Sequence, residues 1–449
     1  MLFETTIAAI ATTPGGAIGI IRLSGTDALP IALKVWKSNF ENSKIEPRRM
    51  QLGKCYSELG EIEQALLVFM PGPHSYSGED IVEIQCHGGA LSTRTVLMAL
   101  LKQGAIAAEP GEFTKRAFVN GKMDLTQAEA VVDIIDSHSE MALHAANRQL
   151  DGALGRKANT IYNNANQLLG EIEVRMDFVD EDLDFDSQQK LKDDLAQIAT
   201  DINKLKSSKQ EGEVLRHGVK VVLAGIPNAG KSSMMNLFLG RDRAIVTAIP
   251  GTTRDVLEEF AHARGIPIRL FDTAGIRETE NEVERIGVER SHSYLKDAQI
   301  ILWLVDSTEP ETAQLIPTNI IDRPNLIVIA NKADHQDSKP LNLPEAVTVI
   351  QASALTEIGF DQILDQIEAL VWVNPHHEEI DIAINSRHAD LLEKAATEMQ
   401  EIELAIEMED WEIVSVALRG ILRYIGSITG QAVSPDVLDN IFSRFCIGK

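Results

Sequence analysis

A phosphate-binding loop between a predicted strand and a predicted helix dictates the fold of the middle of this chain. Residues 225–232 read Gly-Ile-Pro-Asn-Ala-Gly-Lys-Ser and follow the apolar, β-rich run 219–224. The glycines of such a block let backbone N–H groups approach phosphate oxygens closely. Lys231 would reach the β and γ phosphates, and Ser232 would bind Mg²⁺ beside the positive end of the next helix. This order predicts an α/β nucleotide domain; a glycine-rich surface turn is the alternative.

Two later blocks select a guanine nucleotide. Asp-Thr-Ala-Gly at 272–275 would place Asp272 in the magnesium shell and leave the Gly275 N–H for the γ phosphate. Asn-Lys-Ala-Asp at 331–334 would set Asp334 against guanine, whose N1–H and N2 amino group both donate, whereas adenine has an acceptor at N1. Ligands in parallel α/β sheets bind at the carboxyl ends of strands. The three blocks together therefore predict a GTP site.

Short apolar runs give the elements around these blocks. Ser353 and Ala354 follow the last run, and their backbone would contact guanine O6. Gly240 is expected to close the helix after the loop, because glycine favours helix C-termini. The expected elements are the strands 219–224, 266–271, 326–330 and 346–350 and the helix 232–239.

Composition excludes several classes of protein. Acidic residues outnumber basic ones by 67 to 42, and a net charge of −25 repels phosphate backbones, so high-affinity RNA binding by the whole surface is not expected. Cys55, Cys86 and Cys446 lie far apart, which argues against a disulfide framework or a zinc site. The sequence lacks an 18-residue apolar run and a charged leader. We expect a soluble, cytoplasmic protein.

Three kinds of pattern follow one another along the chain. Residues 1–120 mix short strands with Gly/Pro turns and predict an α/β domain. Apolar residues recur at helical spacing in residues 121–215 and again in 374–449. The nucleotide domain, 216–373, is therefore expected as an insertion into one helical domain built from the two flanking segments. The strands expected in the first domain are residues 5–11, 17–23, 65–70 and 81–85.

Two other segments have more than one interpretation. Residues 177–186 carry six acids in ten positions, which fits a solvated turn between helices better than a metal cluster. Cys86 and His87, at a predicted strand end, suggest nucleophilic chemistry. Adjacent strand residues point to opposite faces, however, and a strand leading through two glycines into a helix accounts for the segment equally well.

Five segments match the pattern of a known family. They are residues 19–25 (Gly-Ile-Ile-Arg-Leu-Ser-Gly), 110–114 (Pro-Gly-Glu-Phe-Thr), 125–130 (Leu-Thr-Gln-Ala-Glu-Ala), 251–255 (Gly-Thr-Thr-Arg-Asp) and 445–449 (Phe-Cys-Ile-Gly-Lys). With these marks the chain resembles, from end to end, the tRNA-modifying GTPases of the MnmE (TrmE) family. The resemblance implies an N-terminal α/β domain that binds folate and dimerises, a helical domain and an inserted Ras-like P-loop G domain.

The resemblance also implies an activity and partners. Members work with an FAD-dependent partner, MnmG, in a heterotetramer or larger assembly, and add an aminomethyl-type (carboxymethylaminomethyl) group at C5 of the wobble uridine of certain tRNAs. A 5-formyl- or methylene-tetrahydrofolate supplies the one-carbon unit, and GTP hydrolysis drives the cycle. The tRNA contacts would be made mainly through the partner. By motif match, the folate contacts are Arg22, Glu83, Lys122 and Lys449.

The hydrolytic residues differ from those of small signalling GTPases. Ile276 stands where those proteins place a water-orienting Gln, and an apolar side chain cannot orient water. The resemblance assigns catalysis to Glu284 and implies that K⁺ replaces an arginine finger when two G domains meet. Pro250 stiffens the loop that would hold this ion.

The resemblance implies a complete set of nucleotide and metal ligands. Mg²⁺ would be held by Ser232 and Thr253, and K⁺ by Asn228, Thr247, Ile249 and Thr252. The implied GTP contacts are Asn228, Ala229, Gly230, Lys231, Ser232, Ser233, Thr247, Ala248, Ile249, Pro250, Gly251, Thr252, Thr253, Asp272, Thr273, Ala274, Gly275, Asn331, Lys332, Ala333, Asp334, Ser353, Ala354 and Leu355.

Two other functions fit parts of the sequence. A ribosome-assembly GTPase would share the G domain and the missing Gln, but such proteins typically add a basic RNA-binding domain, which the acidic composition argues against. A nucleotide-binding scaffold without hydrolysis would tolerate the loss of Asp272 or Asp334, and this chain has both.

Overall fold

The computed structural model describes residues 4–40, 44–177, 188–241, 258–272, 294–372, 382–408 and 410–449. By its backbone contacts the chain divides into two compact units. The first comprises Met1–Val132, Gln149–Asn203 and Asp390–Lys449, and the second comprises Asp133–Arg148 and Lys204–Ala389. Residues 133–148, predicted within a helical domain, therefore cluster with the nucleotide-binding part of the chain.

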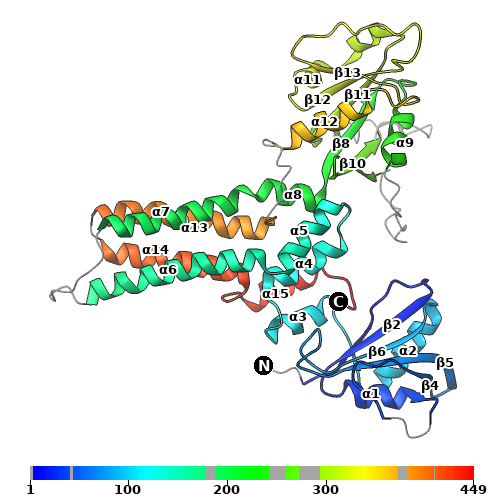
Figure 1. Cartoon of the computed structure of the whole chain (residues 1–449), viewed down its shortest axis with the longest axis vertical. Coiled ribbons are helices and arrows are strands. Elements are labelled where there is room, and N and C mark those ends of the chain that lie inside the picture. The colour runs from blue at the N-terminus through cyan, green and yellow to red at the C-terminus, as the bar shows by residue number, and fades with distance from the viewer. Residues whose placement is uncertain are drawn as a thin grey trace, which may run out of the picture. The chain divides into compact units, whose positions relative to one another are not determined.

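The first unit begins with an α/β module built on a seven-stranded sheet (Figure 1, blue). The strand order is β3-β4-β5-β6-β2-β1-β7, and β1 and β7 pair in parallel. The elements are β1 (Ile7–Ile10), β2 (Ile18–Ser24), α1 (Ala28–Val35), β3 (Trp36–Ser38), β4 (Gln51–Ser57), β5 (Gly60–Met70), β6 (Ile81–His87), α2 (Ala90–Lys102), β7 (Ile106–Ala107) and α3 (Glu112–Val119).

Alternation along β1 explains how this sheet is covered. Successive strand residues point to opposite faces. Ala8 packs with the buried side chains of α1 and α2, whereas Ile7 and Ala9 pack with Phe113 of α3. The two faces of the sheet therefore carry different layers, and α3 lies over the face opposite to α1 and α2. The four strands predicted in residues 1–120 are confirmed as β1, β2, β5 and β6, with ends shifted by a few residues.

The helical part of the chain combines long helices with several short ones (Figure 1). In the first unit, α6 (Ala153–Asp177) packs along α14 (Trp411–Thr429), with Ile161, Ala165 and Ile172 buried on one stripe of α6. Asp410 caps α14 by accepting a hydrogen bond from the Ile413 N–H at 3.2 Å. The helices are α4 (Leu125–Ile135), α5 (Glu140–Leu150), α6 (Ala153–Asp177), α7 (Gln188–Ser207), α8 (Lys209–His217), α13 (Ser386–Glu407), α14 (Trp411–Thr429) and α15 (Pro435–Phe442).

The second unit contains a six-stranded sheet in the order β13-β12-β11-β8-β10-β9. β9 is antiparallel to β10, and the other neighbouring pairs are parallel. The elements are β8 (Val219–Gly225), α9 (Lys231–Arg241), β9 (Glu258–Ala263), β10 (Ile266–Asp272), β11 (Ile300–Asp306), a 3₁₀ helix (Pro310–Leu315), α11 (Thr318–Ile321), β12 (Leu326–Asn331), β13 (Thr348–Gln351) and α12 (Phe360–Val371).

Both faces of this second sheet are buried, as in doubly wound α/β domains. Val221 and Leu223 of β8 belong to one apolar cluster, and Val222 and Ala224 belong to another. A strand that is buried on both faces needs apolar residues at nearly every position. For this reason the apolar runs in the sequence predicted the strands of this sheet. The fold class, an α/β domain with a helical domain and a Ras-like P-loop domain, is confirmed.

Two predicted element ends in this unit were wrong by two residues, and others differ by one residue. α9 continues through Gly240 to Arg241, because a single glycine weakens a helix interior without ending it. β13 begins at Thr348 rather than at residue 346, because the Val347 N–H closes a turn onto the Pro344 carbonyl.

Within the described residues, no helix combines the length and the apolarity needed to cross a membrane.

Candidate functional site

The phosphate-binding loop lies between β8 and α9, as predicted. Gly225 has φ +140°, and a Cβ there would lie 2.3 Å from the carbonyl oxygen of Leu304. Gly230 has φ +93°, and its Cβ would lie 2.2 Å from Nδ2 of Asn331. Both positions therefore require glycine. The Nζ atom of Lys231 donates to two carbonyl oxygens of the loop at 3.0 and 2.7 Å, which holds the ammonium group at the phosphate-binding side.

The carboxyl ends of parallel strands meet beside this loop. Asp272 of β10 is in register with Leu223 of β8, and Asp306 of β11 is in register with Asn331 of β12. Ser232 is exposed in the first turn of α9. The structure thus brings the backbone of Asp272 and the predicted Lys231 and Asn331 blocks to one edge of the sheet.

Asn331 connects the phosphate-binding loop to the predicted base-binding segment. Its Nδ2 donates to the Ala229 carbonyl oxygen at 2.8 Å, and its Oδ1 accepts from the Ala354 N–H at 3.0 Å. The Ala354 N–H, expected to contact guanine O6, is therefore donated to Asn331 here. Asp334 and Leu355 are exposed close to this link along the chain, so both are accessible to a ligand.

Asp306 holds Lys332 in place, a role that no sequence pattern indicated. The Nζ of Lys332 donates to Oδ2 of Asp306 at 2.5 Å, while Oδ1 accepts from the N–H and hydroxyl of Thr308 at 3.0 and 2.7 Å. Burial would raise the pKa of Asp306, but hydrogen bonds from Lys332 and Thr308 outweigh burial and lower that pKa. The aspartate therefore remains ionised and fixes the lysine of the Asn-Lys-Ala-Asp block.

Replacing Asp306 with asparagine is expected to weaken GTP binding by about 3- to 10-fold and to leave kcat nearly unchanged. The amide keeps an acceptor for Thr308 but loses the charge that holds Lys332, whose side chain is 41% exposed and therefore partly screened by water. Nucleotide titration and steady-state kinetics measure the two effects. Asp322→Asn, at an exposed acid of the same unit, is the control. An unchanged dissociation constant in Asp306→Asn would contradict this role.

Part of the predicted site lies outside the described residues. These residues are the loop positions Thr247, Ala248, Ile249, Pro250, Gly251, Thr252 and Thr253, the block positions Thr273, Ala274 and Gly275, and Glu284.

A second cluster of predicted residues lies in the first unit. Arg22 and Glu83 are cross-strand partners on β2 and β6, and Nε and Nη2 of Arg22 lie 2.9 and 2.8 Å from Oε1 of Glu83. Nη1 of Arg22 also donates to the carbonyl oxygen of Gly448 at 3.4 Å. Gly448 directly precedes Lys449, so this contact places the backbone at the C-terminus beside the Arg22–Glu83 ion pair. Arg22 and Glu83 therefore form one unit rather than two separate charges.

The C-terminal tail reaches this cluster because a glycine allows a close approach. Gly448 has φ +96°, and a Cβ there would lie 2.4 Å from the carbonyl oxygen of Ile10. The Gly111 N–H donates to the Cys446 carbonyl oxygen at 3.4 Å, which fixes the tail at the start of α3. The guanidinium carbon of Arg22 lies 5.8 Å from the centre of the Phe113 ring.

The fourth predicted folate residue, Lys122, contacts the loop between β5 and β6. Its Nζ donates to the Pro73 carbonyl oxygen at 3.0 Å. In the same loop, the Tyr76 hydroxyl lies 2.9 Å from Oγ1 of Thr114. Burial raises the pKa of Tyr76, while Thr114 and the nearby positive charge of Arg22 oppose the rise. Tyr76 therefore links the Lys122 end of the cluster to the Arg22 end, and no sequence pattern pointed to it.

Cys86 does not have the environment of a nucleophile. Burial raises the pKa of its thiol to about 11, and the charge of Glu63 adds to that rise. His87, on the opposite face, lies 2.5 Å from Oε2 of Glu63 through Nδ1. The strand-to-helix alternative is confirmed, since β6 leads through Gly89 into α2. Among the described residues, no group of three or more His, Cys, Asp or Glu side chains is placed to hold a metal ion.

Comparison with known proteins covers the whole chain. The MnmE helical domain model matches residues 125–446, and the model named GTP-binding protein TrmE N-terminus matches residues 6–122. A tRNA modification GTPase MnmE from Clostridioides difficile is 41% identical over 461 residues, covering 100% of both chains. The chain belongs to the MnmE family. Another member, a tRNA modification GTPase MnmE from Natranaerobius thermophilus, is 40% identical over 99% of this chain and 100% of its own length.

Family membership and geometry agree on the nucleotide site. As a member of the MnmE family the chain is a GTPase, and the described part of its P-loop has the glycines, lysine and asparagine link that phosphate binding requires. Asp306 and Tyr76 were missed, because their roles depend on neighbours that lie far away in sequence.

Proposed function

We propose that this GTPase, together with an FAD-dependent MnmG-like partner, adds the aminomethyl-type (carboxymethylaminomethyl) group at C5 of the wobble uridine of certain tRNAs. GTP hydrolysis drives the conformational cycle, and a 5-formyl- or methylene-tetrahydrofolate supplies the one-carbon unit. The observation that carries the proposal is the cluster of Arg22, Glu83 and the C-terminal tail, which lies in a different unit from the P-loop. A one-carbon site and a GTP site on separate domains fit this activity.

The donor set of the first cluster suits a folate. Arg22 and the ammonium groups of Lys122 and Lys449 match the carboxylates of the glutamate tail, and Glu83 matches the amino and N–H donors of the pterin ring. Because Arg22 and Glu83 are already paired, ligand binding would exchange part of that ion pair for ligand contacts. The folate itself would supply the one-carbon unit, while these residues bind and orient it.

The proposed domains follow the boundaries of the sequence analysis. Residues 1–120 form the folate-binding and dimerising domain, residues 121–215 and 374–449 form the helical domain, and residues 216–373 form the G domain. We propose a homodimer through the first domain, transient pairing of G domains and tRNA contact mainly through the partner. The cytoplasm is the proposed location, because the tRNA substrate and the reduced thiols of Cys55, Cys86 and Cys446 fit it.

The P-loop has side chains that suit the proposed metal ions. Ser232 is exposed in the first turn of α9, where its hydroxyl would join Thr253 in holding Mg²⁺. Asn228 has φ +66° and is exposed at the turn of the loop, so its amide oxygen is available for K⁺ together with Thr247, Ile249 and Thr252. The two cations would neutralise charge on the phosphates.

GTP hydrolysis is expected to be faster in K⁺ than in Na⁺, and Asn228→Ala is expected to remove the difference. An amide oxygen at this position would complete the coordination of the larger ion, and rates should rise with protein concentration if G domains pair. Phosphate release in KCl and NaCl at several protein concentrations provides the measurement. Equal rates of the unchanged protein in the two salts would contradict the role of K⁺.

The proposed function is tested by mass spectrometry of tRNA from cells that lack this protein. Loss of the C5 group at the wobble uridine, restored by the intact gene, is the expected result. An unchanged amount of the C5 group in tRNA from the deletion strain would refute the proposal. Ribosomal particles that copurify with the protein would instead favour a ribosome-assembly GTPase.

A further inference from the structure

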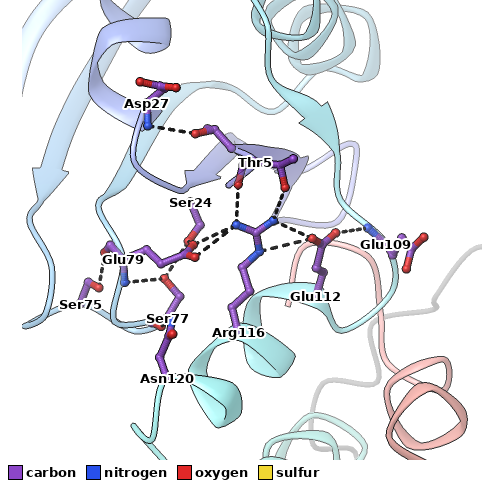
Figure 2. Close-up of polar contacts among 11 residues, drawn as sticks. Thr5, Ser24, Asp27, Ser75, Ser77, Glu79, Glu109, Glu112, Arg116 and Asn120 are labelled. Carbon is purple, nitrogen blue, oxygen red and sulfur yellow. Dashed lines mark hydrogen bonds and ion pairs between the residues drawn. The ribbon is translucent and has the colours of Figure 1, made fainter. Parts of the chain in front are cut away.

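Arg116 of α3 is fully buried and makes polar contacts to three segments of the first unit (Figure 2). Its Nε and Nη2 donate to Oε1 of Glu112 at 3.3 and 2.8 Å, and its Nη1 donates to both carboxylate oxygens of Glu79 at 3.3 and 3.1 Å. The carbonyl oxygen and hydroxyl of Thr5 accept at 2.7 and 3.1 Å. All three guanidinium nitrogens are thus engaged, as a buried charge requires.

The network extends into the loop between β5 and β6. Oε2 of Glu79 accepts from the hydroxyl of Ser24 at 2.7 Å, and that hydroxyl lies 2.7 Å from the hydroxyl of Ser77. Asn120, just after α3, donates to the Ser77 carbonyl oxygen at 2.8 Å, and Ser75 donates to the Glu79 carbonyl oxygen at 2.5 Å. Figure 2 shows Thr5, Glu79 and Glu112 around the guanidinium group, with the other side chains of the network on the Glu79 side. The loop is therefore held at alternate residues.

The same loop and the same helix also carry the candidate folate cluster. Tyr76 lies between Ser75 and Ser77, and its hydroxyl is hydrogen-bonded with that of Thr114 in α3. Lys122 donates to the Pro73 carbonyl oxygen of the same loop. Phe113 of α3 lies beneath Arg22, which belongs to β2. The spacing between Lys122 and Arg22 thus depends on how α3 and the loop are fixed to the sheet. Arg116 makes that connection through Thr5 before β1 and, through Glu79, to Ser24 of β2.

A buried ion pair contributes little net stability compared with apolar packing, but a rigid guanidinium fork specifies one geometry. We propose that Arg116 is a positioning residue of the folate site. It holds the loop 73–79 and α3 against the sheet, so that Lys122, Tyr76 and the Arg22–Glu83 pair keep their spacing before the ligand arrives. This inference rests on the folate-binding function proposed above.

The test is titration of the full-length protein with 5-formyltetrahydrofolate. Arg116→Lys keeps the positive charge but loses the fork, and we expect its folate dissociation constant to rise about tenfold or more with unchanged GTP hydrolysis. Amides 75–79 should exchange hydrogen faster in the folate-free variant. Thr114→Val is the second variant. It removes the buried hydroxyl that pairs with Tyr76 and changes the side-chain volume little. We expect the folate dissociation constant of Thr114→Val to rise about threefold or more.

Arg175→Lys is the matched control. Arg175 pairs with Glu171 on α6 at 2.6 Å and is 11% exposed in its side chain, so this substitution likewise keeps the charge and loses a guanidinium fork, but in the helical part. It should lower the melting temperature without changing folate affinity. Unchanged folate affinity in Arg116→Lys, or in Thr114→Val if the lysine variant does not fold, overturns the inference. Failure of the unaltered chain to bind the folate overturns the proposed folate site itself.

Discussion

Replacing Asp334 with asparagine is expected to lower GTP affinity by about 10²-fold and to make XTP the preferred nucleotide. Guanine would present two donors, N1–H and the N2 amino group, to this carboxylate, whereas xanthine has a carbonyl oxygen at C2. The amide of asparagine donates to that oxygen but leaves the guanine amino group unpaired, at a cost of about 1–3 kcal/mol for each unpaired group. Titration with both nucleotides gives the two dissociation constants.

The chain offers a matched control in the same loop. Asp337→Asn changes an exposed acid three residues away, which lies 3.6 Å from His335 rather than at the predicted base site. Its affinities for both nucleotides should remain those of the parent. Unchanged GTP binding in Asp334→Asn would mean that the base binds elsewhere.

Glu284→Ala is expected to lower kcat for GTP hydrolysis by about 10²-fold or more, the range for a group that positions or activates water. Ile276 cannot orient water, so another residue must, and the family resemblance assigns this role to Glu284. Nucleotide affinity should barely change, because Lys231, Ser232 and backbone N–H groups are expected to make the ground-state phosphate contacts. Single-turnover hydrolysis and nucleotide titration separate the two effects.

Neighbouring acids provide the control for Glu284. Glu278, Glu280 and Glu282 stand in the same segment, and alanine at each should leave turnover close to that of the parent. The alternative for Glu284 is an exposed ion pair worth less than about 1 kcal/mol, which would not affect the rate. Parent-like turnover in Glu284→Ala, with a loss in one of the three neighbours, would move the role to that neighbour.

Most of the nucleotide domain was predictable because its signals are local. The runs before residues 225, 272 and 331 are mostly apolar, interrupted only by Lys220 and Arg269, as expected for strands buried on both faces. The strands form where these runs predicted them. Ends of elements were less predictable. Gly240 was read as a stop, but it lies inside α9, since glycine ends a helix only where the chain also turns away.

The candidate folate site was only partly predictable. The family resemblance named Arg22, Glu83, Lys122 and Lys449 by their motifs, yet nothing in those motifs predicted that Arg22 pairs with Glu83. That pairing follows from the register of β2 with β6, which sets residues 22 and 83 opposite each other. Tyr76 and Arg116 had no signal at all, because an isolated tyrosine or arginine has no periodic pattern to distinguish it.

The sequence by itself determined the strand–loop–helix at the P-loop and the order of α/β and helical segments. Backbone dihedral preferences and side-chain periodicity act over a few residues, so a linear reading captures them. The tertiary structure decided which charges meet. Arg22 reaches Gly448 across 426 positions, Asp306 fixes Lys332, and Arg116 joins Thr5 to Glu79. Electrostatic pairing depends on distances of a few ångströms, and only the folded chain sets those distances.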